Sequence, residues 1–254
     1  MTEPTDANLN VGKGFGRTTA LVPLSEASSN LRQRLLDGSV VAAVIAAVPS
    51  EFQIRSDEDL RRSIHRTLEE QAEVDDVYVF AYGSLMWNPA LHHTECHRAT
   101  VKGWHRSFCL TLQFGRGTSS RPGAMLALDE GGSCEGAVLR IAREDVHSEL
   151  LILWRREMLT GAYEARWVQA SVQDREVQAL TFVANRHDPS YMANANLSQT
   201  ADLIATGAGV VGTCAEYFAS TVQTLRSIGI HDAGIERLAG ELSNRLRIKP
   251  PRCD

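Results

Sequence analysis

The sequence contains no apolar run long enough to cross a lipid bilayer. Its longest run, VVAAVIAAV from Val40 to Val48, is far shorter than the roughly 20 residues that a transmembrane helix needs. The N-terminal stretch MTEPTDANLNVGKGFGR is polar and has no apolar core of the kind that a signal peptide requires. From these two absences we predict a protein with neither a membrane partner nor a secretory signal.

Cysteine pairs and an excess of positive charge are also lacking. The five cysteines are widely spaced, with no C-x-x-C motif, which favours free thiols in a reducing compartment over a disulfide framework. We therefore predict a cytoplasmic protein. The 26 lysines and arginines are outnumbered by 31 aspartates and glutamates, and the net charge of −5 argues against nucleic acid as the main partner. An anionic small molecule is compatible with this charge, because backbone donors can bind an anion locally.

Two motif-like stretches lack the context that a cofactor would need. Gly207 to Gly212 reads G-x-G-x-x-G, with Asp232 further on, but a dinucleotide loop must follow a strand and the preceding SQTADLIAT has a helical pattern. We interpret these glycines as the connection between two helices. His92 to His97 reads HHTECH and holds metal-ligand residue types without the spacing of a known site. We predict a solvent-facing polar loop there, with no metal and no cofactor.

The N-terminal third of the chain has helical patterns. Residues 1 to about 25 are expected to be a flexible tail. Residues 25–38 and 56–71 are expected to be helices, the first stopped by Gly38 and the second capped by Ser56. We predict that residues 1–74 form a tail and a helical extension that packs against the remainder of the chain.

The rest of the chain, residues 75–248, predicts one α+β domain. Strand patterns are separated by turns such as residues 129–132, and they cover residues 77–81, 99–104, 106–114, 124–129, 134–141, 166–172 and 179–184. A helix is predicted at 144–161, and three more follow Pro189, at 197–207, 214–229 and 232–246. A block of strands followed by a run of helices favours a mostly antiparallel sheet or barrel.

The stretch VYVFAYGSLMWNP, from Val77 to Pro89, is a candidate site segment. A buried-strand pattern stops there at Tyr82-Gly83-Ser84, and strand ends are rigid places from which loop amides can be aimed at a ligand. An ordinary turn with hydrophobic flanks is the alternative. Ser84 is a weak candidate nucleophile, because its surroundings lack the second glycine of a G-x-S-x-G elbow.

Glu157 is the second candidate. It falls on the same helical face as the apolar residues Val146, Leu150 and Leu153, and a carboxylate on a buried face is costly unless it is satisfied or functional. Burial would raise its pKa toward neutrality, as a general base or acid needs. A structural salt bridge with a neighbouring arginine explains the position equally well.

Seven motifs carry a resemblance to a known family. In chain order they are YGSLMWNP, GWHRSFC, RGTSSRPG, LDEGGSCEG, LWRREMLTGAY, ANRHDPSYM and ATGAGVVGTCAEYFAST. From about Val77 to Leu246 the chain resembles the ChaC family of γ-glutamylcyclotransferases, particularly its bacterial members. The resemblance implies a mixed β-barrel with surrounding helices, the γ-glutamylcyclotransferase-like fold. It also implies cleavage of glutathione, or another γ-glutamyl compound, to 5-oxoproline and a free amine, which for glutathione is cysteinylglycine.

The resemblance assigns roles to individual residues. The catalytic glutamate of the family corresponds to Glu157, and the loop that holds the γ-glutamyl group corresponds to the YGSL turn. Two tyrosines match residues that line the pocket in relatives. The substrate-binding set implied in this way is Tyr82, Gly83, Ser84, Leu85, Tyr163 and Tyr191.

The sequence departs from the family pattern at several positions. Many relatives have a serine at Leu112, serine and asparagine at Val211 and Cys214, Gly-Pro at the positions that follow Tyr191, and an aliphatic residue at Ala124. If these positions line the half of the pocket that holds the leaving group, the substitutions affect the preference for glutathione more than they affect the cyclisation chemistry. A non-catalytic binding or regulatory module on the same fold, and an amidase that uses Ser84, are the alternative functions.

Overall fold

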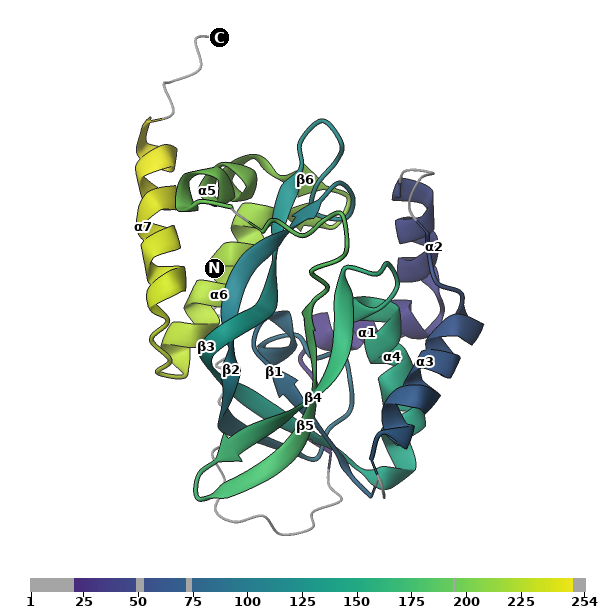
Figure 1. Ribbon diagram of the computed structural model, residues 1–254. Coiled ribbons are helices and arrows are strands. Elements are labelled where there is room, and N and C mark those ends of the chain that lie inside the picture. Colours follow the sequence, from purple (N-terminus) through teal and green to yellow (C-terminus); the bar gives the residue numbers. More distant parts are fainter. Residues whose placement is uncertain (1–20, 49–52, 72–74, 194, 249–254) are drawn as a thin grey trace.

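The computed structural model describes residues 21–48, 53–71, 75–193 and 195–248 and centres on a closed five-stranded barrel (Figure 1). The strands follow the spatial order β1-β3-β2-β4-β5, and β5 closes the barrel by pairing with both β1 and β3. These two closing pairings are parallel and the others antiparallel. The predicted α+β barrel is therefore confirmed. The strands are β1 (Val77–Ala81), β2 (Glu95–Leu112), β3 (Gly123–Ile141), β4 (Tyr163–Val172) and β5 (Arg175–Ala184).

The prediction of four short strands between residues 99 and 141 was wrong, because β2 and β3 are two long, bent strands. The predicted turn at 129–132 lies inside β3, where Gly131 and Gly132 have positive φ angles of 98° and 70°. Opposite them the register shifts between Lys102 and Trp104, and Gly103 has a φ of 82°. Glycine adopts these angles without steric cost, so the ribbon bends without ending.

Helices cover the barrel in two groups. Figure 1 shows α1 (Glu26–Leu36), α2 (Ser39–Ala47) and α3 (Asp57–Glu69) beside α4 (Val146–Glu157), with α5 (Leu197–Thr206), α6 (Cys214–Ser227) and α7 (Ala233–Ile248) on the opposite side. Two 3₁₀ turns, η1 (Ser84–Met86) and η2 (Arg143–Asp145), follow β1 and β3. The predicted boundaries at Gly38 and Ser56 are confirmed: Gly38 separates α1 from α2, and Ser56 caps α3 in a capping box with Asp59. Residues 1–20 of the expected tail lie outside the described residues.

The G-x-G-x-x-G stretch joins two helices, as predicted. It forms a short hairpin of β6 (Ala208–Gly209) and β7 (Gly212–Thr213) between α5 and α6. Asp232, which a dinucleotide site would need for a ribose, instead pairs with the buried guanidinium of Arg106 at 2.6 Å. The stretch therefore lacks the strand-to-helix context of a dinucleotide loop.

The HHTECH stretch is buried, so the prediction of a solvent-facing loop was wrong. His93 and His97 are only 5% and 7% exposed. The carboxylate of Glu95 lies 3.0 Å from His97 Nε2 and accepts a hydrogen bond from Arg140. Ion pairing allows these polar groups to be buried. Among the described residues, no three or more histidine, cysteine or acidic side chains are grouped so that they could hold a metal.

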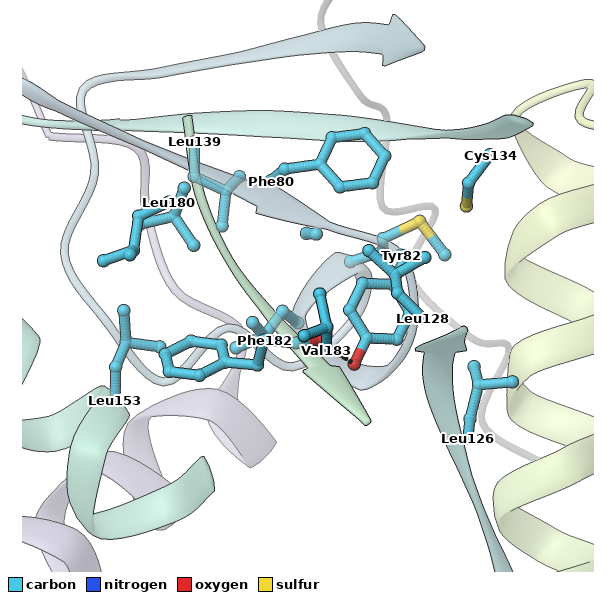
Figure 2. Packing of buried hydrophobic residues seen from close by; sticks show 14 of the residues in the cluster. Phe80, Tyr82, Leu126, Leu128, Cys134, Leu139, Leu153, Leu180, Phe182 and Val183 are labelled. Atoms are coloured by element: carbon cyan, nitrogen blue, oxygen red, sulfur yellow. Dashed lines mark hydrogen bonds between the residues drawn. The ribbon is translucent and has the colours of Figure 1, made fainter. Parts of the chain in front are cut away.

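The barrel interior is apolar and fixes the position of α4. Figure 2 shows Phe80, Leu128, Leu139 and Phe182 among the buried side chains of this core, with Phe182 on the side of Leu153 in α4. Trp154 of α4 is fully buried and meets the Phe182 ring edge-on, with 5.4 Å between the ring centroids. Burial of such a side chain contributes about 1.5–3 kcal/mol, so this contact holds the C-terminal end of α4 against the barrel.

Two further predictions concern the chain as a whole. Within the described ranges, no helix combines the length and the apolar character that a bilayer crossing needs. Four of the five cysteines are described, and they are free thiols, as the sequence predicts: Cys96, Cys109, Cys134 and Cys214. Cys253 lies outside the described residues.

Candidate active site

A cavity of about 300 Å³ lies where β1, α4 and the start of β4 meet. Six of the seven residues predicted for the site line it: Tyr82, Gly83, Ser84, Leu85, Glu157 and Tyr163. The turn and the other two residues are separated by more than seventy positions in the chain. The barrel therefore brings together the turn and the carboxylate that the sequence singled out.

The turn after β1 is tightly packed. The Tyr82 side chain points into the barrel, and its hydroxyl donates a hydrogen bond to the Phe182 carbonyl at 2.7 Å (Figure 2). A Cβ atom at Gly83 would lie 3.1 Å from Leu126 Cδ2 and 3.2 Å from the Tyr217 hydroxyl, so only glycine allows this approach without displacement. Ser84 then starts a 3₁₀ turn. The first amides of such a turn have no acceptor within it, so they are suited to bind an anion.

Glu157 is the last residue of α4, and its carboxylate faces the cavity with 15% of the side chain exposed. Its Oε1 lies 2.9 Å from Nε of Arg156. Burial raises the pKa of Glu157 above its usual value, and the charge and hydrogen bond of Arg156 offset part of that rise. Glu157 therefore forms a salt bridge with a neighbouring arginine and also has the raised pKa that a proton acceptor needs.

Arg156 connects the catalytic candidate to the turn. Its Nη2 donates to Ser84 Oγ at 2.6 Å, and its Nη1 donates to the Asn88 carbonyl at 2.5 Å. One guanidinium therefore contacts Glu157, the first residue of η1 and the segment that follows η1. From the sequence, the neighbouring positions of Arg156 and Glu157 suggested only a salt bridge. The contacts of Arg156 with Ser84 and Asn88 could not be predicted.

Three tyrosines line the cavity together with Glu157: Tyr82 and Tyr217 are buried, and Tyr163 is partly buried. The Tyr163 hydroxyl donates to the Leu126 carbonyl at 2.8 Å, and Tyr217 reaches the cavity from α6. Burial, with a smaller effect of the Glu157 charge, raises the pKa of Tyr82 and Tyr163 well above the usual range and that of Tyr217 to about 12. All three hydroxyls therefore stay protonated at neutral pH.

Tyr191 does not line this cavity, so the structure does not bring it together with the other six predicted residues, and its role in binding stays a prediction. Its hydroxyl donates to Asp129 Oδ2 at 2.9 Å, and Arg186 lies 5.7 Å from the ring centroid. The residue pairs as an isolated bridge with Leu110. The pairing places Tyr191 beside the C-terminal part of β2.

Other residues complete the cavity. Arg116 lines it, lies 5.4 Å from the Tyr217 ring centroid and donates to the Thr213 carbonyl at 2.9 Å. Of the positions that depart from the family pattern, Leu112 and Val211 line the cavity, whereas Cys214 does not; its Sγ donates to the Arg116 carbonyl at 3.2 Å. The motifs RGTSSRPG and AEYFAST contain Arg116 and Tyr217, so a signal for both was present in the sequence.

Comparison with known proteins identifies the family. The family model described as ChaC-like protein matches residues 77–245. The chain belongs to the ChaC-like family. A glutathione-specific γ-glutamylcyclotransferase of Escherichia coli K12 is 43% identical over 189 residues, which cover 74% of this chain and 82% of that protein. Glutathione-specific γ-glutamylcyclotransferase 1 of Homo sapiens is 30% identical over 146 residues, covering 56% and 66%.

A solved structure agrees with this ChaC-like fold. The crystal structure of a yeast γ-glutamyl cyclotransferase specific to glutathione superposes with a TM-score of 0.63 at 19% identity, covering 67% of this chain and 96% of that one. The fold is therefore shared. The ChaC-like region contains the barrel, α4 and α6, but it begins at residue 77, so α1–α3 lie outside it.

Proposed function

We propose that the chain is a γ-glutamylcyclotransferase that cleaves glutathione to 5-oxoproline and cysteinylglycine. The observation that carries this proposal is that Glu157 is the one carboxylate among the described residues that lines the cavity of the Tyr82–Leu85 turn, with only 15% of its side chain exposed. The relative from E. coli is named as glutathione-specific, which supports the choice of substrate. The free thiols and the substrate both suit the cytoplasm.

The reaction closes a ring within one molecule. The α-amine nitrogen of the γ-glutamyl unit attacks its own γ-carbonyl carbon, the ring C–N bond forms, and the amide C–N bond to cysteine breaks. Because both reacting groups belong to one substrate, the main task of the protein is to hold the folded conformer. A narrow cavity with buried aromatic walls is suited to that task.

Glu157 is proposed to move the proton. The attacking amine must lose a proton from its ammonium form, and the departing cysteine nitrogen must gain one. A carboxylate whose pKa is raised by burial accepts the first proton and returns it to the second nitrogen. One residue therefore serves both steps, and neither requires a metal or a redox cofactor.

The two carboxylates of glutathione would be bound at separate places. The amides at the start of η1 are proposed to bind the α-carboxylate of the γ-glutamyl unit. Arg116 supplies a cation on the same cavity for the glycine carboxylate. This division leaves the α-amine free to meet Glu157.

The alternatives fit the geometry less well. A binding module has no need of a carboxylate that burial makes more basic. An amidase would need a base beside Ser84, but Ser84 Oγ accepts a hydrogen bond from Arg156, a permanent cation that cannot take its proton.

Product analysis tests the proposal. The purified chain is incubated with glutathione, and products are separated by liquid chromatography with mass detection. We expect 5-oxoproline and cysteinylglycine, with a higher kcat/KM for glutathione than for γ-glutamyl-alanine. Free glutamate in place of 5-oxoproline would indicate an amidase, and binding without product would indicate a binding module.

A further inference from the structure

The N-terminal helices form one wall of the cavity, although they lie outside the ChaC-like region. Leu31 and Leu35 of α1 and Val40 and Val44 of α2 line the same cavity as Glu157. Each helix contributes a pair spaced by four residues, which places both members of the pair on one face. We call these four residues the N-terminal wall.

Polar contacts fix this wall to the elements that carry the site. Arg32 of α1 pairs with Glu149 of α4 at 2.7 Å, and the Glu149 side chain is only 2% exposed. Ser28 Oγ donates to the side-chain oxygen of Asn88, at the end of the YGSLMWNP stretch, at 2.8 Å. Breaking a buried ion pair is costly, so α1 is held in a defined position beside α4 (Figure 1).

Further apolar residues line the same cavity. Leu112, Phe114 and Val211 come from the end of β2, the segment after it and the β6–β7 hairpin, and Figure 1 shows this hairpin across from α2. Both the N-terminal helices and the segments around the end of β2 therefore contribute aliphatic or aromatic side chains to the cavity. A surface of this kind binds an apolar group in preference to water.

We propose that the N-terminal wall, with Leu112, Phe114 and Val211 opposite, receives an apolar substituent on the leaving group, so that S-alkyl glutathiones are substrates. This inference rests on the proposed function. In glutathione the thiol is the one reactive group that can carry an alkyl chain while the α-amine, the γ-carbonyl and both carboxylates stay intact. The thioether sulfur takes no part in the reaction. The same ring C–N bond forms, the same amide bond breaks, and the proton moves from the ammonium to the amine of S-alkylcysteinylglycine.

A substrate series tests the wall without any mutation. kcat/KM is measured for glutathione, S-methylglutathione and S-propylglutathione by release of 5-oxoproline. Each buried methylene is expected to raise kcat/KM up to about fourfold, so S-propylglutathione should exceed S-methylglutathione by about tenfold. A decline along the series would overturn the proposal.

A matched pair of variants then locates the effect. Val44→Asp places a charge on the wall, and we expect it to abolish the gain from S-methyl to S-propyl. Ile45→Asp is the control, because Ile45 is the next residue on α2, is 55% exposed and does not line the cavity. We expect Ile45→Asp to keep the wild-type increase in kcat/KM from S-methylglutathione to S-propylglutathione. Equal effects of both variants, at similar thermal midpoints, would overturn the assignment to the wall.

The outcomes separate this inference from the proposed function. Release of 5-oxoproline from glutathione but from neither thioether overturns the proposal that S-alkyl glutathiones are substrates, and it leaves the proposed cyclotransferase activity in place. Release from none of the three substrates overturns the proposed function, and with it the role proposed for the N-terminal wall.

Discussion

Replacing Arg156 with methionine should produce a loss of stability that grows with pH. In the wild type, Arg156 offsets the burial of Glu157 through its charge and its hydrogen bond. Methionine keeps much of the apolar stem but removes the cation. The pKa of Glu157 should therefore rise further, and an ionised Glu157 would then be buried without its partner.

The size of the effect depends on the contacts that are lost. Removing one partner of a buried ion pair costs roughly 3–5 kcal/mol when the other stays charged. The pair here is 12% and 15% exposed, so this range applies where Glu157 is ionised. At low pH Glu157 is protonated in the folded and the unfolded states, so the loss of the bonds from Arg156 to Ser84 and Asn88 remains but no unpaired charge is buried, and the deficit is smaller.

The sign of the pH dependence comes from proton linkage. A carboxyl with a raised pKa in the folded state binds protons more tightly there than in the unfolded chain. The contribution of Glu157 to the free energy of unfolding is therefore highest below pH 4.5, its ordinary pKa, and falls as pH rises through the folded-state pKa. In Arg156→Met this fall should be steeper and extend to higher pH than in the wild type.

The assay is thermal unfolding of both proteins between pH 4 and 8. A change of 1 kcal/mol moves the midpoint by about 2–4 °C for a chain of this size, so the deficit near pH 8 should be on the order of 10 °C. Arg155→Met is the matched control, because Arg155 pairs with Asp57, whose pKa is lowered chiefly by that hydrogen bond. Its deficit should be constant above pH 5. A pH-independent deficit in Arg156→Met would refute the reasoning about Glu157.

Three further predictions concern activity. The acid limb of kcat/KM should lie above pH 4.5, because Glu157 must be ionised to accept a proton and burial raises its pKa; a limb at or below that value in a pH–rate profile would contradict the role. Arg116→Met should raise KM for glutathione by about tenfold or more with a smaller change in kcat, and steady-state kinetics showing an unchanged KM would remove Arg116 from substrate binding. Incubation with EDTA should leave turnover unchanged, whereas loss that zinc restores would point to the HHTECH stretch.

The sequence predicted the elements of the fold better than their lengths. Strand and helix patterns located β1, β4, β5 and every described α-helix except α2. They divided β2 and β3 because glycines such as Gly103 and Gly131 usually end a strand, whereas here they bend one. The burial of HHTECH escaped prediction because polar composition indicates exposure, and the arginine that compensates Glu95 comes from β3, more than forty residues later.

For the site, the sequence predicted residues but not their connections. Helical periodicity placed Glu157 on a buried face, and the strand ending at Tyr82 located the turn, so the two halves of the site were predicted separately. Their meeting depends on barrel closure, which no local pattern shows. The N-terminal wall and the exclusion of Tyr191 likewise depend on how distant segments pack.

Glu157→Gln tests the central claim most directly, because glutamine keeps the shape of the side chain and cannot accept the ammonium proton. We predict that kcat for 5-oxoproline release from glutathione falls by ~10²–10⁴-fold while the thermal midpoint at neutral pH is unchanged or raised. Glu164→Gln is the control, since Glu164 pairs with Arg166 at the surface and does not line the cavity, and it should keep wild-type turnover. Near-normal turnover of Glu157→Gln with a lowered midpoint would contradict the account and leave Glu157 as a structural partner of Arg156.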